Sequence, residues 1–478
     1  MKLPINPLVF REYDIRGISF LDLSNTFAES LGLAYAKLIT GKNPAANRKN
    51  LTIAVGKDCR LSSDSYEEAL IDGLLAGGLD VIRLGLCPTP LLYFSLYNLD
   101  LDGAIMVTAS HNPPDYNGFK VCVGKDTIYG KQIIELRTLI ENGAGPATKK
   151  GSLSDFAIIP IYQKFIINQF QAIKKDVKTK KVVVDCGNGM ASIVITEILR
   201  SLEIEVIELY CDLDGTFPNH LPDPTDERNL VDLKKAVKKH SANFGLAYDG
   251  DADRLGVING DGQLIPGDDL MFIFSQALLK VQPNSIVISE VKASSRLFSE
   301  IKKKGGVPLM WKVGHSHLKA KIRETGALLA GGLSGHFCFA DRYFGFDDAI
   351  YATLRLLEVT SDSPETLSQL LKDLPLSFST PEIRIKFEDQ IKFKLVNQVK
   401  ELFKKDTSLE EFIFTEIDGI RIDFKDGWGL VRASNTQPAL TLRFEALSEK
   451  RLAEIKLIFE KAINKICQKM YHSPVYLN

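Results

Sequence analysis

The sequence predicts an α/β protein of several domains, built on mixed and mostly parallel sheets, that ends in a smaller α+β domain. A short apolar run followed by a Gly- or Asp-rich loop recurs along most of the 478 residues. Helix-like segments such as residues 230–240 separate these runs, and buried strands alternating with helices are typical of α/β units. The strand-like runs are residues 51–55, 104–107, 182–184, 244–248 and 327–330.

The pattern changes in the last quarter of the chain. Ile383, Ile385 and Phe387 alternate with charged residues, and residues 420–424 and 440–444 alternate in the same way. This period of two predicts strands with one exposed face. Two amphipathic helices are expected beside them, with apolar faces at Ile391, Leu395, Val399 and Leu402 and at Leu452, Ile455, Phe459, Ile463 and Ile466.

Composition suggests where the domains are divided. Gly-, Ser- and Pro-rich stretches at residues 143–154 and 374–381 read as linkers. A chain of this length exceeds one hydrophobic core, so a third break is expected between residues 250 and 262, on length alone. We therefore expect domains at 1–150, 151–256, 257–372 and 373–478.

The bulk composition excludes several classes of protein. A formal net charge of −1 gives no reason to expect a nucleic-acid or membrane partner. No run approaches the roughly 20 apolar residues of a membrane span, and Arg11 follows too early for a signal peptide. The seven cysteines form no CxxC pair, which favours reduced thiols and a cytoplasmic location.

The strongest metal signal is the segment DGDADR at residues 249–254. Asp249, Asp251 and Asp253 follow an apolar run at i, i+2 and i+4, and they can converge if the backbone curls at the small residues between them. Hard oxygen ligands suit Mg²⁺. A solvated acidic turn is the alternative, whereas an EF-hand fails because Arg254 and Gly260 occupy its Gly and Glu positions. Arg254, next to the cluster, would direct a cation at a substrate phosphate bound to the same metal.

A second candidate is the loop TASHNP at residues 108–113. Ser110 follows an apolar run and is flanked by His111 and Asn112 as donors, with Lys120 ten residues further on. A serine nucleophile needs a base, a metal or both, and His111 is included among the catalytic candidates for that reason. A simple turn closed by Asn-Pro is the alternative, and no GxSxG hydrolase elbow is present.

A third candidate is RASNT at residues 432–436. An arginine can clamp a phosphate through two hydrogen bonds, and hydroxyls, an amide and backbone N–H groups can complete the cradle. The alternative is a loop that caps itself. The residues of this candidate phosphate site are Arg432, Ser434, Asn435 and Thr436. A nucleotide site is not expected, because residues 187–192 lack the third glycine of a dinucleotide loop and no GxxxxGK[ST] occurs.

TASHNP, DGDADR, a GxxSG loop and RASNT, in this order, resemble the α-D-phosphohexomutases, above all the bacterial phosphomannomutase/phosphoglucomutase branch. Further matching segments run from end to end, namely FREYDIRG, NGFK, FPNHLPDP, WKVGHS and GWGLVRASNTQP. The resemblance implies three related α/β domains and a fourth that closes over a central cleft. On this resemblance we expect the reactive serine in domain 1–150, the metal site in 151–256, the sugar site in 257–372 and the distal phosphate site in 373–478. It also implies a monomer that binds hexose phosphates.

The resemblance further implies a phosphoserine at Ser110, with Mg²⁺ held by its phosphate and by Asp249, Asp251 and Asp253. Tyr13, Arg16 and Lys120 match positions that surround the phosphoserine and serve proton transfer. Matches to sugar-lining positions are Arg254, Lys292, His315 and Ser334, and Arg421 joins Arg432, Ser434, Asn435 and Thr436 at the distal phosphate. The implied reaction interconverts hexose 1- and 6-phosphates of mannose or glucose, with glucose or mannose 1,6-bisphosphate as activator and intermediate.

One position departs from the family pattern. The sugar loop of the family usually reads Gly-Glu-x-Ser-Gly, and its Glu accepts hydrogen bonds from the C3 and C4 hydroxyls. Here Gly332 stands in place of that Glu. Losing two hydrogen bonds to a charged acceptor could cost on the order of 10²- to 10⁴-fold in substrate handling, unless water or His336 substitutes in part. A weakly active or non-catalytic paralogue that binds sugar phosphate is therefore the alternative, and a glucosamine or pentose phosphate is an alternative substrate.

Overall fold

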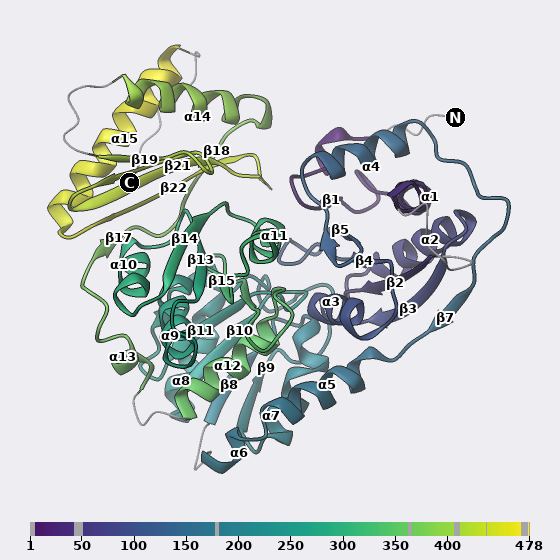
Figure 1. The fold of residues 1–478 in the computed structure, drawn as a ribbon, viewed down its shortest axis with the longest axis horizontal. Helices are drawn as coiled ribbons and strands as arrows, with labels where there is room; N and C mark the ends of the chain where they lie inside the picture. The colour runs from purple at the N-terminus through teal and green to yellow at the C-terminus, as the bar shows by residue number, and fades with distance from the viewer. Residues whose placement is uncertain are drawn as a thin grey trace.

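The computed structural model describes residues 5–42, 51–176, 181–361, 366–405, 412–435, 437–469 and 477. Within them the chain forms four β-sheets with helices packed against them (Figure 1). The C-terminal domain lies against the third domain, and the N-terminal domain lies beside both. No described helix combines the length and apolar content that crossing a bilayer requires.

The first domain is a seven-stranded mixed sheet ordered β1-β5-β4-β2-β3-β7, with β6 paired to β5. The centre is parallel, whereas β5 runs antiparallel to β4 and β1. Neighbouring β2 residues pack on opposite faces, Ile53 toward α1, α2 and α4 and Ala54 toward α3. The elements are η1 (Pro7–Val9), β1 (Ile15–Ile18), α1 (Asn25–Lys42), β2 (Thr52–Lys57), α2 (Ser63–Ala76), β3 (Asp80–Leu86), α3 (Thr89–Asn98), β4 (Gly103–Val107), β5 (Tyr116–Val123), β6 (Asp126–Thr127), α4 (Lys131–Glu141) and β7 (Leu153–Asp155).

The second domain has a five-stranded sheet ordered β12-β11-β10-β8-β9. β10, β8 and β9 are parallel, and β11 and β12 extend the sheet antiparallel. Its central strands are buried along their whole length, as expected for a sheet covered on both faces. The elements are α5 (Ile158–Gln169), α6 (Ile173–Asp176), β8 (Lys181–Asp185), η2 (Met190–Ile193), α7 (Ile195–Ser201), β9 (Glu205–Leu209), η3 (Glu227–Leu230), α8 (Val231–His240), β10 (Phe244–Tyr248), β11 (Leu255–Asn259) and β12 (Leu264–Ile265).

The third domain has a four-stranded sheet ordered β14-β13-β15-β16, parallel except for β16. One continuous apolar cluster joins its helices α9 and α12 to α5, α7 and α3 of the two preceding domains, so these domains share a core. The elements are α9 (Gly267–Val281), β13 (Ile286–Glu290), α10 (Ser295–Lys303), β14 (Val307–Trp311), α11 (His315–Thr325), β15 (Leu329–Gly331), β16 (Phe337–Phe339), α12 (Ala349–Ser361) and α13 (Leu367–Leu370).

The C-terminal domain is an antiparallel sheet ordered β17-β22-β21-β20-β19, with β18 also paired to β22. The predicted helices and strands are present, but the prediction of one exposed sheet face is wrong, because β22 is buried at every residue. One face packs on α14 and α15, and the other meets the third domain through Trp428 and Leu430. The elements are β17 (Phe378–Ser379), β18 (Ile383–Lys386), α14 (Asp389–Lys404), β19 (Ile413–Thr415), β20 (Ile420–Phe424), β21 (Gly427–Ala433), β22 (Ala439–Ala446) and α15 (Glu449–Lys469).

The structure corrects one predicted domain boundary. A division after residue 256 is wrong, because it cuts β11, and β11 and β12 belong to the sheet of the second domain. Length alone could not reveal two antiparallel strands that follow the acidic loop. We propose to divide these domains after Ile265 and to keep the boundaries at 150 and 372, with β7 crossing over to pair with β3.

Candidate active site

Ser110 lies on the loop that follows β4 and is held in a strained, left-handed conformation. Its φ is 53°, a region that few residues other than glycine adopt. The hydroxyl of Thr108 accepts a hydrogen bond from the backbone N–H of Ser110 at 2.9 Å. The Ser110 hydroxyl donates to Asp249 Oδ2 at 2.7 Å and lies 3.1 Å from His111 Nδ1. The serine of the first domain therefore contacts the acidic segment of the second.

Arg60 holds this loop in place from beneath. Its guanidinium donates to the backbone carbonyls of Ser110 and Asn112 at 2.8 and 2.6 Å, and also to those of Pro113 and Tyr116. The side chain is fully buried and its Nε donates to Asp58 Oδ2 at 3.1 Å. One arginine thus satisfies four carbonyl groups of a loop that has no regular hydrogen-bond ladder.

The three aspartates after β10 converge, as the sequence predicted. Their carboxylate oxygens lie within 4.8 Å of one another, and all three side chains are buried. Asp249 Oδ1 accepts the backbone N–H groups of Asp253 and Arg254 at 3.0 Å each, so the curl of the loop is closed on its own first carboxylate. Burial and the neighbouring charges of Asp253 and Asp251 raise the pKa of Asp249 well above its ordinary value.

Lys120 crosses from β5 into this acidic cluster. Its ammonium donates to Asp251 and to Asp253 at 2.5 Å each. Burial acts to raise the pKa of Asp251, but Lys120 outweighs it and lowers that pKa to about 2. The same carboxylates hold the pKa of Lys120 above its ordinary value despite burial, so Lys120 remains a cation.

The acidic cluster fits a divalent metal ion. Asp251 Oδ1 and Asp253 Oδ1 are buried without a hydrogen-bond partner among the described residues, and a buried oxygen left in that state is costly unless a cation or donor meets it. Three carboxylates supply the hard oxygen ligands that Mg²⁺ prefers. The donor set therefore matches the metal that the sequence predicted.

The N-terminal candidates surround the serine loop from the other side. Arg16 donates to Asn112 Oδ1 and to Asp14 Oδ2 at 2.6 Å each, which ties β1 to the loop. Burial, followed by the charges of Arg254 and Arg16, lowers the pKa of His111 well below its ordinary value, so this imidazole is neutral. Burial and then Asp14 raise the pKa of Tyr13 to about 12.

Tyr13 faces the third and fourth domains. Its ring packs edge-on against His315, with centroids 5.2 Å apart. The charges of Arg432, Arg254 and Arg16 all act on its phenol, and they come from three different domains. Among the described residues, no hydrogen bond joins Tyr13 to Ser110.

Arg254 connects the acidic loop to the sugar-site candidates. Its Nε donates to His336 Nε2 at 3.1 Å and lies 3.8 Å from Asp249 Oδ2. His336 Nε2 is therefore an acceptor, and its Nδ1 lies 2.9 Å from Asp347 Oδ2. Asp347 Oδ1 accepts a hydrogen bond from Lys319 at 2.8 Å.

His315 completes this network at the start of α11. Lys319 Nζ donates to His315 Nδ1 at 3.0 Å. Burial and the charge of Lys319 lower the pKa of His315 well below its ordinary value. Its Nε2 is buried without a hydrogen-bond partner among the described residues, which leaves a polar atom for a ligand.

Lys292 and Ser334 meet at one carboxylate. The hydroxyl of Ser334 donates to Glu290 Oε1 at 2.5 Å, and Lys292 Nζ lies 3.9 Å from Glu290 Oε2. Lys292 also donates to Glu382 at 2.8 Å, and Glu382 immediately precedes β18 of the C-terminal domain. These contacts link the third and fourth domains.

The distal phosphate candidates are only partly brought together. Arg432 is buried beside Asp418 at 3.0 Å and acts electrostatically on Tyr13, so the RASNT segment faces the other candidates. Ser434 Oγ accepts the backbone N–H of Gln437 at 3.2 Å and is buried, and Asn435, next to it on the loop, is half-buried. Thr436 lies outside the described residues.

Arg421 lies at the junction between the third and fourth domains. It donates to the carbonyls of Val291 and Ala293 in the third domain at 2.8 and 2.7 Å, pairs with Asp423 at 2.9 Å and stacks on Trp428. In this arrangement its donors are engaged between the third and fourth domains, and its role at the distal phosphate stays a prediction.

Sequence reasoning missed several residues of this region. Arg60, Glu290, Asp347 and Lys319 carry buried contacts but stand singly in GKDCR, SEVKAS, FGFDD and HLKAK, with no local motif that marks them. For Arg60 and Glu290, the available signal was a charged residue close to the end of an apolar, strand-like run.

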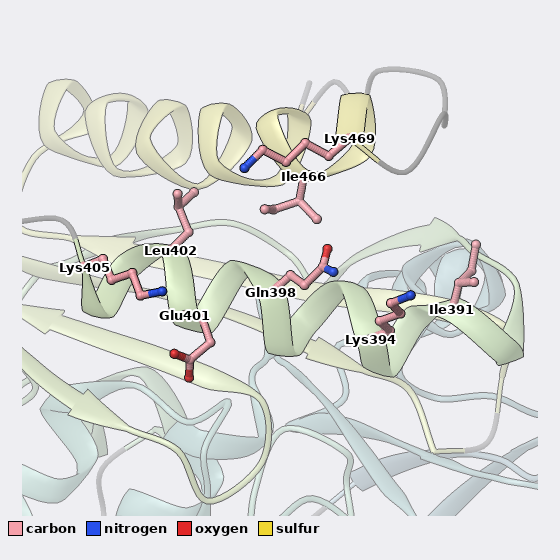
Figure 2. Close-up of a pocket in the computed structure, with 8 residues that line it drawn as sticks. All are labelled: Ile391, Lys394, Gln398, Glu401, Leu402, Lys405, Ile466 and Lys469. Carbon is pink, nitrogen blue, oxygen red and sulfur yellow. The ribbon is translucent and has the colours of Figure 1, made fainter.

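A separate hollow lies between α14 and α15 of the C-terminal domain (Figure 2). Its volume is about 530 Å³, and it is lined by Ile391, Lys394, Gln398, Glu401, Leu402, Lys405, Ile466 and Lys469. It contains none of the candidate residues, so we do not place the active site there.

The buried serine beside three aspartates, with arginines from other domains around it, defines a phosphoryl-transfer enzyme of the phosphohexomutase class. Four family models match in order, each described as phosphoglucomutase/phosphomannomutase: alpha/beta/alpha domains I, II and III at residues 7–143, 160–262 and 266–378, and the C-terminal domain at 382–462. The chain belongs to the phosphoglucomutase/phosphomannomutase family, whose members are intramolecular phosphotransferases.

The relatives support an active mutase. A phosphomannomutase/phosphoglucomutase of Pseudomonas aeruginosa is 42% identical over 97% of each chain, and a phosphoglucomutase of Neisseria meningitidis is 41% identical over 95% of this chain and 96% of its own. A solved structure of a family protein from Burkholderia thailandensis has a TM-score of 0.88 at 38% identity, over 99% of this chain and 100% of that one. They give no support to the non-catalytic alternative raised by Gly332.

Proposed function

We propose that this phosphohexomutase works through a phosphoserine at Ser110 and a hexose 1,6-bisphosphate, with mannose or glucose phosphates as substrates. The observation that carries the proposal is the 2.7 Å contact between the Ser110 hydroxyl and Asp249 inside a buried cluster of three aspartates. Glucose or mannose 1,6-bisphosphate would serve as both activator and intermediate.

In the proposed first step, the phosphoryl group of Ser110 passes to the free hydroxyl of a hexose monophosphate. The bond from phosphorus to Ser110 Oγ breaks, a bond to the sugar oxygen forms, and the hydroxyl proton leaves to a base. The bisphosphate then turns end for end and returns its other phosphate to Ser110 Oγ. Such transfer depends on positioning and on neutralised charge more than on covalent chemistry.

We assign the metal to Asp249, Asp251 and Asp253 together with the serine phosphate. When bound, Mg²⁺ would neutralise charge that develops on the transferring phosphoryl group. Because its pKa is raised, Lys120 acts in this proposal as a cation beside the phosphate rather than as a proton carrier. His111 Nδ1, neutral and 3.1 Å from Ser110 Oγ, is the atom placed to accept a proton there.

A mutase needs a second anion site that holds and does not react. We propose that Arg432, Ser434, Asn435 and Thr436 form it, with Arg254, Lys292, His315 and Ser334 along the sugar. The pairing of Arg11 in the first domain with Asp389 on α14, at 3.1 Å, supports closure of the C-terminal domain over the reacting groups. Closure would keep water from the phosphoserine.

Two assays test the proposal together. Intact mass and peptide mapping should find one phosphate on the Ser110 peptide. Glucose 1-phosphate and mannose 1-phosphate, each with a trace of glucose 1,6-bisphosphate, should be converted to the 6-phosphates in a coupled assay. Ser110→Ala should lose at least about 10³-fold in kcat, and near wild-type activity in that variant would refute the assigned nucleophile.

We also propose that the chain acts as a monomer in the cytoplasm. All residues of both anion sites come from one chain, and all seven cysteines are unpaired as free thiols. Sedimentation of the purified enzyme tests the first of these proposals.

A further inference from the structure

Gly332, where the family pattern has a glutamate, lies against another glutamate. A Cβ atom built on Gly332 would lie 3.1 Å from Glu290 Oε2 and 3.2 Å from Glu290 Cγ. Gly332 is not among the glycines with a positive φ, so its backbone does not require glycine. The carboxylate of Glu290 therefore occupies the space that a side chain at position 332 would fill.

Glu290 reaches this place because two parallel strands end side by side. It is the last residue of β13, and Ser289 before it pairs with Gly331 at the end of β15. The hydroxyl of Ser289 donates to the Gly331 carbonyl at 2.8 Å, which fixes the two strand ends relative to each other. Ligands of α/β sheets gather at such carboxyl ends.

The carboxylate of Glu290 has one engaged oxygen and one that lacks a donor. Oε1 accepts the hydroxyl of Ser334, a candidate sugar-binding residue, at 2.5 Å. Oε2 is buried with no hydrogen-bond partner among the described residues, and its nearest cation is Lys292 Nζ at 3.9 Å. A buried carboxylate oxygen without a donor is destabilising, and a ligand hydroxyl would relieve that cost.

We propose that Glu290 replaces the glutamate missing at position 332 and accepts a hydrogen bond from a ring hydroxyl of the hexose phosphate at Oε2. This inference rests on the proposed function. It makes Glu290 a substrate-binding residue, and it accounts for an intact catalytic cluster beside an apparently incomplete sugar loop.

The alternative role for the Glu290 carboxylate is to form an ion pair with Lys292. Lys292 is closer to Glu382, at 2.8 Å, than to Glu290, at 3.9 Å. Glu382 belongs to the C-terminal domain, so opening of that domain would remove the cover over Lys292 and Glu290. The ion-pair partner of Lys292 is thus Glu382, and Glu290 Oε2 is left for the sugar.

The first test replaces Glu290 by glutamine, which keeps the volume and an acceptor for Ser334. Glu290→Gln should lower kcat/KM by about 10- to 100-fold, as expected for a hydrogen bond to a charged group. Glu300→Gln is the matched control, because Glu300 is also buried in the third domain with an unpaired oxygen. Melting midpoints and near-ultraviolet circular dichroism of both variants check the fold.

A structural role for Glu290 would not change the selectivity for sugar hydroxyls. Wild-type enzyme should prefer glucose 1-phosphate over its 3-deoxy or 4-deoxy analogue by at least about tenfold. Glu290→Gln should lose most of that preference for one of the two analogues. An unchanged preference for both would overturn the inference.

The second test moves the carboxylate between the two positions. Gly332→Glu alone should lower activity, because a second carboxylate would lie against Glu290 in a buried site. Glu290→Ala combined with Gly332→Glu should recover at least about tenfold over Glu290→Ala, a coupling expected of residues in contact. Increased turnover in Gly332→Glu alone, or no recovery in the double variant, would overturn the inference.

The wild-type enzyme separates this inference from the proposed function. Absence of turnover and of phosphate on wild-type Ser110 would refute the proposed function, and the inference with it. Normal wild-type turnover with a Glu290→Gln variant indistinguishable from Glu300→Gln would refute the inference alone.

Discussion

The hydroxyl of Ser110 lies 2.7 Å from a carboxylate oxygen of Asp249, although 139 positions separate the two residues in the chain. The contact depends on close docking of the first two domains. A Cβ atom on Gly250 would lie 2.4 Å from the Ser110 carbonyl, and the backbone N–H of Thr89 donates to the Asp251 carbonyl at 2.9 Å. Ser110 and the three aspartates are thus positioned by one junction between the first two domains.

Removal of the metal is the first prediction that follows from this junction. Treatment with EDTA should lower mutase activity by about 10²- to 10³-fold, because the negative charge of the phosphoryl group then lacks its counter-ion. Added Mg²⁺ should restore it, and Na⁺ at the same ionic strength should not. Unchanged activity after exhaustive chelation would contradict the assignment of the three aspartates.

The support of the Ser110 loop by Arg60 gives a second prediction. Arg60→Ala leaves four loop carbonyls without their donor and should destabilise the enzyme by about 3–5 kcal/mol, with a fall in kcat as Ser110 leaves its strained conformation. Arg83→Ala is the control, since Arg83 pairs with the exposed Asp155 at the surface and should change stability by under about 1 kcal/mol. Equal melting temperatures for the two variants would argue against the support.

Local motifs in the sequence were enough to predict that Ser110 and the three aspartates lie together. Ser110 and Asp249 each follow an apolar strand, and strand ends in α/β sheets are where ligands gather, so their meeting could be expected from the pattern and the family resemblance together. The strands and helices around them could also be predicted from the periodicity of apolar residues.

Residues that act through tertiary contacts could not be predicted in this way. The role proposed for Glu290 depends on its contact with Gly332, 42 positions later in the chain. The role of Arg60 depends on its hydrogen bonds to loop carbonyl groups, the first of them 50 positions away. The prediction that one face of β22 is exposed failed for the same reason. The alternating pattern of β22 does not show that a neighbouring domain covers its polar side. Arg443 on that side pairs with Asp268 of the third domain at 2.9 Å.

Arg421 carries the third prediction, concerning domain closure. Arg421→Ala leaves the Val291 and Ala293 carbonyls unpaired and should cost about 1.4–3 kcal/mol of the closed arrangement. Loss of phosphate from Ser110 to water should then rise by about 10- to 100-fold. Arg451→Ala is the control in the same domain, because Arg451 pairs with Asp426 near the surface. Loss of phosphate at the wild-type rate in Arg421→Ala would place closure elsewhere.

The last prediction concerns the dependence of stability on pH. Asp348 immediately precedes α12 and accepts hydrogen bonds from Tyr162 and Tyr343 at 2.8 Å each and from the backbone N–H of Tyr351 at 2.9 Å. Burial nevertheless raises its pKa from 3.8 to about 6, only partly offset by these hydrogen bonds. Between those two values the folded protein holds a proton that the unfolded chain has lost, so this group makes the fold less stable as pH rises.

Asp348→Asn removes that titration while it keeps the size of the side chain, and the hydroxyls of Tyr162 and Tyr343 can turn to accept from the new amide. At about 1.4 kcal/mol for each pH unit, the rise from 3.8 to about 6 amounts to about 3 kcal/mol. The free energy of unfolding of the wild type, relative to the variant, should therefore fall by about 3 kcal/mol between pH 4 and pH 7. Urea denaturation of both proteins across that range measures it, and parallel profiles would show that Asp348 titrates normally.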